Sequence, residues 1–135
     1  MEVDIAGQIL LIGAFLMLGV GIFTGLKMSQ IRGSEPTVPK YLTMAHIAGY
    51  QQAPILLGLV VAVAVSDLSA STETLGAALV TASAVLLATK ELVNYSQGVK
   101  DEFAEKSLGY KLALVFGPLH VIGIAILGYG ALTGF

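Results

Sequence analysis

The first group of polar side chains lies inside an apolar segment, and its functional groups suit ligand binding or proton transfer. The stretch MAHIAGYQQAPILLG, residues 44–58, contains His46, Tyr50 and Gln51. On a helix His46 and Tyr50 share a face, and Gln51 lies beside it. Ionisable and amide groups are costly at membrane depth and usually face the protein interior. The stretch therefore predicts either a polar cavity lined by these residues or hydrogen bonds that join neighbouring helices.

A second polar group lies in LLATKELVNYSQG, residues 86–98. Lys90 and Asn94 fall on one helical face, while Glu91 and Tyr95 fall on the adjacent one. A tyrosine hydroxyl near a lysine ammonium can donate a proton or bind an anion. The alternative is structural, because Lys90 and Glu91 can extend toward the membrane interface where the helix ends.

The third group consists of Lys106 and Lys111, with His120 deeper in the same apolar run. A lysine at a membrane edge commonly anchors a helix at the interface. A single intramembrane histidine without a nearby carboxylate favours a hydrogen-bonded packing role. We therefore predict no metal site, and the absence of cysteine excludes disulfides and thiolate ligands.

The composition indicates an integral membrane protein. Of the 135 residues, 56% are hydrophobic and only 12% are charged, and the mean hydropathy is +0.84. A soluble domain usually has about 25% charged residues. The net charge of -2 and the lack of a basic tract argue against a nucleic-acid partner. The acidic start, MEVDIAGQ, argues against a cleaved signal peptide, so we expect the first apolar run to be retained.

Four apolar runs are long enough to cross a bilayer, which takes about 20 helical residues. We place them at residues 5–26, 41–66, 75–97 and 107–133 of one domain that covers residues 1–135. Strand-like alternation is missing, so the predicted fold is an all-α, polytopic bundle of four transmembrane helices. Gly13, Met17, Gly21 and Gly25 on the first run, and Gly109, Ala113 and Gly117 on the fourth, predict faces of close helix packing.

Basic residues set the expected orientation. All seven lysines and arginines flank the first or third connector, and the other side carries Glu2, Asp4, Asp67 and Glu73. The positive-inside rule therefore predicts cytoplasmic first and third connectors, with both termini on the opposite side.

Three motifs occur at matching places in the spans. In the second span, Ala45, His46 and Pro54 occupy the A, H and P positions of a known membrane-protein pattern, R-A-H-x-N-x-x-E-x-x-P-L-x-L-L. The third span ends in TKELVNYSQG, which matches the pattern G-R-x-x-x-x-Y-G in part. The fourth opens with KSLGY, which matches R-x-x-G-[MY] except for lysine in place of arginine. Over nearly its whole length the chain thus resembles the MAPEG family, the membrane-associated proteins in eicosanoid and glutathione metabolism.

The resemblance implies a homotrimer that joins or reduces lipophilic substrates with glutathione or a related thiol. The ligand would lie between subunits, near the basic ends of the second and third helices. It implies catalytic roles for Tyr95 and Lys106. The binding residues that it implies are His46, Tyr50, Gln51, Lys90 and Asn94.

The chain departs from the family pattern at the positions that grip glutathione. Ala48 and Gln51 stand where the family has Asn and Glu, and Lys90 and Lys106 replace arginines. Lysine keeps the charge but loses the bidentate fork of arginine. These departures favour an alternative function, in which a non-enzymatic relative binds lipid or serves as an accessory subunit of a membrane complex.

A haem protein is the third hypothesis. Small four-span haem-dependent isomerases, such as styrene oxide isomerase, carry H-x-x-G-x-x-N, which His46, Gly49 and Gln52 follow loosely. A haem held by both His46 and His120 is disfavoured. The second and fourth spans run in the same direction, and His120 lies deeper by on the order of 10 Å at helical rise.

Overall fold

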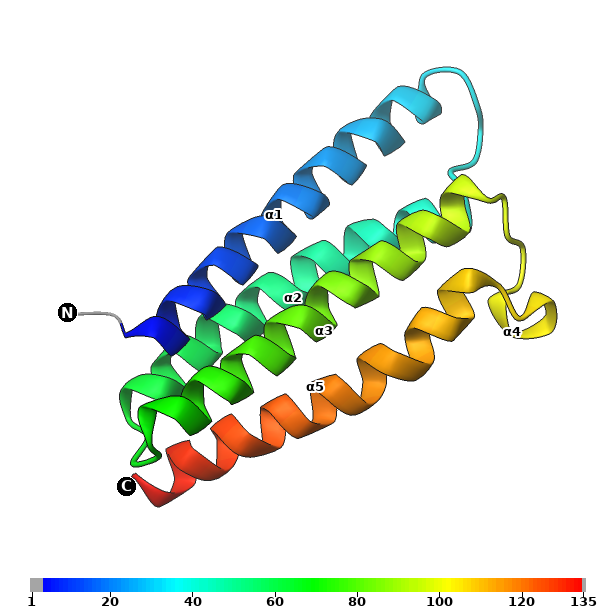
Figure 1. Cartoon of the computed structure of the whole chain (residues 1–135). Coiled ribbons are helices and arrows are strands. Elements are labelled where there is room, and N and C mark those ends of the chain that lie inside the picture. The colour runs from blue at the N-terminus through cyan, green and yellow to red at the C-terminus, as the bar shows by residue number, and fades with distance from the viewer. Residues whose placement is uncertain (1–3, 135) are drawn as a thin grey trace.

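The computed structural model describes residues 4–134, and within this range it is helical with short connectors and no strand. Four long helices lie side by side, and one short helix lies at one end of the bundle, beside the start of the last long helix (Figure 1). In chain order they are α1 (Ile5–Arg32), α2 (Lys40–Ala64), α3 (Ala70–Ser96), α4 (Glu102–Glu105) and α5 (Leu108–Thr133).

Side-chain caps set where three of the long helices begin. Asp4 accepts a hydrogen bond from the Gly7 amide at 2.7 Å, and Ser69 accepts one from the Thr72 amide at 3.4 Å. Ser107 caps α5 in the same way. Such caps satisfy amides that the first helical turn leaves without partners. The cap at Ser69 starts α3 earlier than the predicted residue 75.

Small residues let the helices pack closely. The backbones of α1 and α2 lie close together where the helices cross. A Cβ atom added to Gly49 would lie only 2.6 Å from the Gly21 nitrogen. On the other side of α3, a Cβ on Gly123 would lie 2.7 Å from the Val80 nitrogen. The predicted packing face of α1 is thus confirmed at Gly21. The predicted face of the fourth span is confirmed at Gly109, where a Cβ would collide with the Asn94 side chain, but not at Gly117, where nothing in the chain lies within 4 Å of such a Cβ.

The core runs between α1, α2 and α3. Its largest fully buried apolar side chains are Leu10, Met17 and Leu56, together with Leu127 of α5. Helix α5 packs mainly on α3. Of the residues in the most apolar 18-residue segment of α5, only 11% are buried, whereas 44% are buried in the corresponding segment of α3. Most of the α5 surface is therefore free to face lipid or another chain.

All four long helices are long and apolar enough to span a membrane. This confirms the predicted all-α fold with four helices that could span a membrane. The connectors 33–39 and 97–107 lie at one end of the bundle, and the described ends of the chain lie at the other (Figure 1). We call the first of these the loop end, and all seven basic residues lie in its half of the molecule.

Candidate functional site

A buried polar cluster lies at the loop end, where α3 meets the connector before α5. The Glu102 carboxylate accepts hydrogen bonds from Lys90 Nζ at 2.8 and 3.0 Å, and from Asn94 Nδ2 at 2.7 Å. These three residues are at most 5% exposed. Lys90 and Asn94 share a face one turn apart, as predicted. Their partner is a connector residue that the sequence analysis did not identify.

Helix α4 places Glu102 in the cluster. Asp101 caps this helix by accepting hydrogen bonds from the amides of Phe103 and Ala104, at 2.9 and 3.2 Å. The Glu102 amide donates to the buried Tyr41 hydroxyl at 2.8 Å, which ties α4 to the start of α2. The short helix and the tyrosine together fix the carboxylate over the end of α3.

The start of α5 is joined to the same cluster. Ser107 donates a hydrogen bond to Asn94 Oδ1 at 2.7 Å and accepts one from the Tyr110 amide at 3.1 Å. Gly109 packs directly against the Asn94 side chain, where a Cβ would collide with the amide. The KSLGY motif therefore joins α5 to α3 in this structure.

Glu91 extends the buried polar cluster toward α2. Its Oε1 lies 2.8 Å from Lys90 Nζ, and its side chain is 3% exposed. Its Oε2 is buried and has no hydrogen-bond partner among the described residues. Glu91 also lines a groove of about 220 Å³ between α2 and α3, with Met44, Ile47, Ala48, Gln51 and Leu87. We call this the outer groove.

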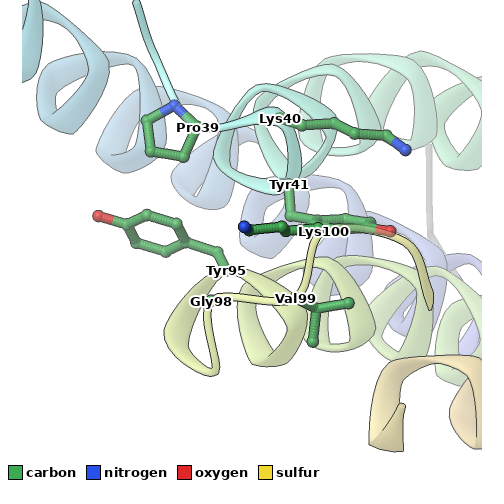
Figure 2. A pocket seen from close by; sticks show the side chains of 7 residues that line it. All are labelled: Pro39, Lys40, Tyr41, Tyr95, Gly98, Val99 and Lys100. Atoms are coloured by element: carbon green, nitrogen blue, oxygen red, sulfur yellow. The ribbon is translucent and has the colours of Figure 1, made fainter. Parts of the chain in front are cut away.

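A second hollow, the loop-end pocket, has a volume of about 330 Å³. It is lined by Pro39, Lys40, Tyr41, Tyr95, Gly98, Val99 and Lys100 (Figure 2). Figure 2 shows that the Lys40 and Tyr41 side chains extend in one direction and the Tyr95 ring in the other. Lys40 Nζ lies 5.1 Å from the centre of the Tyr41 ring, a cation–π contact. With two ammonium groups and no acidic lining residue, the pocket suits an anion.

Two exposed carboxylates stabilise the connector beside this pocket. The amides of Ala104 and Phe103 lower the pKa of Asp101 by hydrogen bonding to its charged form. The amides of Asp101 and Lys100 lower the pKa of Glu105 in the same way, at 3.0 and 2.8 Å. Both carboxylates therefore stay ionised and bonded to the connector backbone, and the charges of Lys40 and Lys100 act in the same direction on Asp101 and Glu105, respectively.

His46 and Tyr50 face α1. The Gly21 carbonyl lies 2.8 Å from His46 Nδ1, and because a carbonyl only accepts, Nδ1 carries the proton. The His46 ring packs edge-on against Tyr50, with ring centres 4.9 Å apart. Gly21 and Gly25 supply the space for these rings. Of the two interpretations of this stretch, the observed contacts match hydrogen bonding between helices.

His120 belongs to a different interface. Its Nδ1 lies 2.9 Å from the hydroxyl of Ser83, which joins α5 to α3. His46 lies between α1 and α2, so the two histidines do not share a site within one chain. Among the described residues, no group of three His, Asp or Glu side chains is arranged to hold a metal ion.

The predicted site residues thus fall into five places. Lys90 and Asn94 lie in the buried polar cluster, Tyr95 in the loop-end pocket and Gln51 in the outer groove. His46 and Tyr50 lie at the α1 interface. Lys106 is exposed at the end of α4, with a left-handed backbone at φ 46°.

Four residues at the loop end were missed by the sequence analysis, namely Lys40, Tyr41, Lys100 and Glu102. Asp101 was the available signal, because an aspartate followed by Glu-Phe-Ala-Glu is a capped start for a short helix. Comparison of the chain with protein-family models, curated proteins and solved structures finds no match.

Proposed function

We propose that this chain is a MAPEG-like membrane protein that binds glutathione, or a similar carboxylate-bearing thiol, in the loop-end pocket and transfers it to a lipophilic substrate. The observation that carries this proposal is that Lys40 and Lys100 both line a pocket without an acidic lining residue, although their side chains extend in opposite directions (Figure 2). A carboxylate bound there gains from the positive charge that these lysines give to the pocket. The Tyr95 hydroxyl adds a hydrogen-bond donor at the same pocket.

The cationic surroundings also suit thiol chemistry. An ammonium group near a thiol favours the thiolate, which is the reactive form. Lys100 lines the pocket, and Lys106 lies six positions further along the same connector. The thiolate sulfur attacks an electrophilic carbon of the lipophilic substrate and forms a thioether, while the leaving group departs with the displaced electron pair. Tyr95, which lines the pocket, protonates that leaving group in this proposal.

Membrane placement and assembly complete the proposal. The loop end faces the cytoplasm, because it carries all the basic residues. Three copies assemble in the membrane, and the exposed surfaces of α1 and α5 supply contact area. In such a trimer a neighbouring subunit covers the outer groove, which shields Gln51 from lipid.

One observation favours a second candidate, a non-enzymatic protein that binds a lipid or serves within a larger complex. Lys90 and Asn94, the residues expected to hold a thiol ligand, are already bonded to Glu102. Neither is therefore available to a ligand unless α4 moves.

A conjugation assay separates the two candidates. Purified protein in detergent is mixed with glutathione and a lipophilic electrophile, and the thioether product is measured by mass spectrometry. We expect Lys100→Ala to lower the yield at least tenfold. Lys27→Ala, an exposed lysine of α1 that does not line the pocket, serves as the matched control. Glutathione binding without product supports the second candidate, and absence of both contradicts the enzyme proposal.

A further inference from the structure

The connector between α3 and α5 contains a short segment, residues 100–105, that is bonded mainly to itself. The carboxylates of Asp101 and Glu105 accept hydrogen bonds from backbone amides within the segment. Among residues 4–134, every hydrogen bond or ion pair that joins the segment to one of the long helices or their caps involves Glu102. The segment is therefore a small unit with a single point of attachment.

Apolar packing adds little to this attachment. Phe103, the large apolar side chain of the segment, is 69% exposed, and its ring contacts the Tyr110 ring edge-on with ring centres 5.8 Å apart. A segment with few buried apolar contacts opens at a lower free-energy cost than the core of the same protein. The contacts of Glu102 thus determine whether the segment stays in place.

The buried polar cluster keeps other partners when Glu102 leaves it. Lys90 Nζ lies 2.8 Å from Glu91 Oε1, so one buried ion pair remains. Asn94 still accepts the hydrogen bond from Ser107. Breaking a buried pair is most costly when it leaves a charge without a partner. That cost is reduced here, because Lys90 keeps a carboxylate and Glu102 belongs to a connector at the surface.

The backbone is left-handed on either side of the segment. Gly98 has φ 65° and Lys106 has φ 46°, and no other residue among 4–134 has φ in this region. Glycine adopts this conformation freely, whereas a residue with a Cβ is strained in it. Strain at Lys106 therefore favours movement of the segment, and the contacts of Glu102 oppose it.

We propose that residues 100–105 form a lid on the loop-end pocket, which Glu102 holds closed and which opens to admit and release the ligand. Lys100 belongs to the lid and lines the pocket. Tyr41 also lines the pocket, and its hydroxyl accepts the hydrogen bond from the Glu102 amide. Opening therefore takes Lys100 away from the pocket, and a bound carboxylate that contacts Lys100 keeps the lid closed. The inference rests on the proposed function for the ligand and adds the control of its entry and release.

Distances between two spin labels test the lid directly. The chain has no cysteine, so Lys27→Cys on α1 and Ala104→Cys on the lid place labels at two exposed positions only. Electron paramagnetic resonance of the purified protein in detergent gives the distribution of distances between them. We expect Glu102→Gln to raise the fraction of longer distances at least tenfold. Glu35→Gln removes the same charge from the exposed first connector and should leave the distribution unchanged.

Tyr41→Phe is a second variant that leaves the ion pairs of the cluster intact. It removes the hydroxyl that accepts from the Glu102 amide, so it should also raise the fraction of longer distances, to a smaller extent. Distributions that match the parent protein in both variants overturn the lid.

Added glutathione separates the lid from the proposed function. Saturating glutathione should return the Glu102→Gln protein to the shorter distances of the parent. Glutathione that binds, as measured by calorimetry, without changing the distances overturns the lid. Longer distances in the variants together with no glutathione binding overturn the proposed function and leave the closing role of Glu102 standing.

Discussion

Both oxygens of the Glu102 carboxylate accept hydrogen bonds from the Lys90 ammonium, although one residue lies in a connector and the other in a long apolar helix. The same carboxylate also accepts a hydrogen bond from Asn94. All three residues are at most 5% exposed. The connector before α5 is therefore part of the packed structure at the loop end, and it forms one wall of the candidate site.

Glu102→Ala should destabilise the protein by about 3 kcal/mol, because it leaves the buried Lys90 charge with one carboxylate partner where it had two. The free energy of unfolding, measured by denaturant titration in detergent, checks this. Glu35→Ala, at an exposed position in the first connector, is the control and should change it by less than about 0.5 kcal/mol. Equal changes in the free energy of unfolding for the two variants would show that the Glu102–Lys90 ion pair contributes little to stability.

Gly49→Ala should separate α1 from α2, since the new Cβ would lie 2.6 Å from backbone nitrogen and 2.8 Å from a backbone carbonyl oxygen. Backbone cannot move aside as a side chain can, so we expect a loss of at least about 2 kcal/mol. Gly58→Ala is the matched control on the same helix, where nothing lies within 4 Å. It should be neutral or stabilising by up to about 1 kcal/mol. Comparable thermal stability of the two variants would contradict the observed crossing.

Lys106→Gly separates folding from chemistry at a predicted catalytic residue. Lys106 has a left-handed backbone, φ 46°, which glycine adopts without strain. The substitution should keep or raise stability by up to about 1 kcal/mol. If Lys106 acts on the thiolate, the variant also loses conjugation activity. A stable variant with full activity would remove Lys106 from the mechanism.

Acid should loosen the connector around α4. Asp101 and Glu105 have lowered pKa values because backbone amides bond to their charged forms. The folded state thus holds protons less readily than the unfolded chain. Their contribution is complete above the ordinary carboxyl range of about 4 and is lost as pH falls through the lower folded values. NMR shifts of the Ala104 and Asp101 amides should follow this titration.

Replacing both carboxylates, with Asp101→Asn and Glu105→Gln, is the control and should abolish the titration of those amide shifts. If the NMR shifts of the Ala104 and Asp101 amides stay constant in the wild-type protein down to strongly acid pH, the hydrogen bonds from these amides to the two carboxylates are contradicted.

The number of the long helices follows from hydropathy, because segments long enough to cross a bilayer leave a clear signal. Their bounds were less accurate, since α1 continues to Arg32, beyond the predicted residue 26, and α3 begins at Ala70, before the predicted residue 75. Their packing was predictable where small residues recur at four-residue spacing, as at Gly21. The same spacing failed at Gly117, since the pattern does not say whether a neighbouring helix lies opposite. Helix α4 was missed because a helix of four residues has no periodicity to detect.

The candidate site was less predictable for a related reason. Helical spacing placed Lys90 and Asn94 on one face, which the structure confirms. Their partners Glu102 and Tyr41 come from other elements, and only the tertiary arrangement brings them together. His46 matched a family motif, yet its hydrogen bond goes to the Gly21 carbonyl. A sequence motif fixes neither the neighbour of a side chain nor its direction.

Calorimetric titration of glutathione into the purified protein tests the central claim most directly, because it measures binding at the loop-end pocket without requiring turnover. We expect saturable binding by the wild-type protein, affinity at least tenfold weaker for Lys100→Gln, and unchanged affinity for Lys27→Gln. No detectable binding by the folded wild-type protein, or equal affinity for all three proteins, would contradict the proposed anion site.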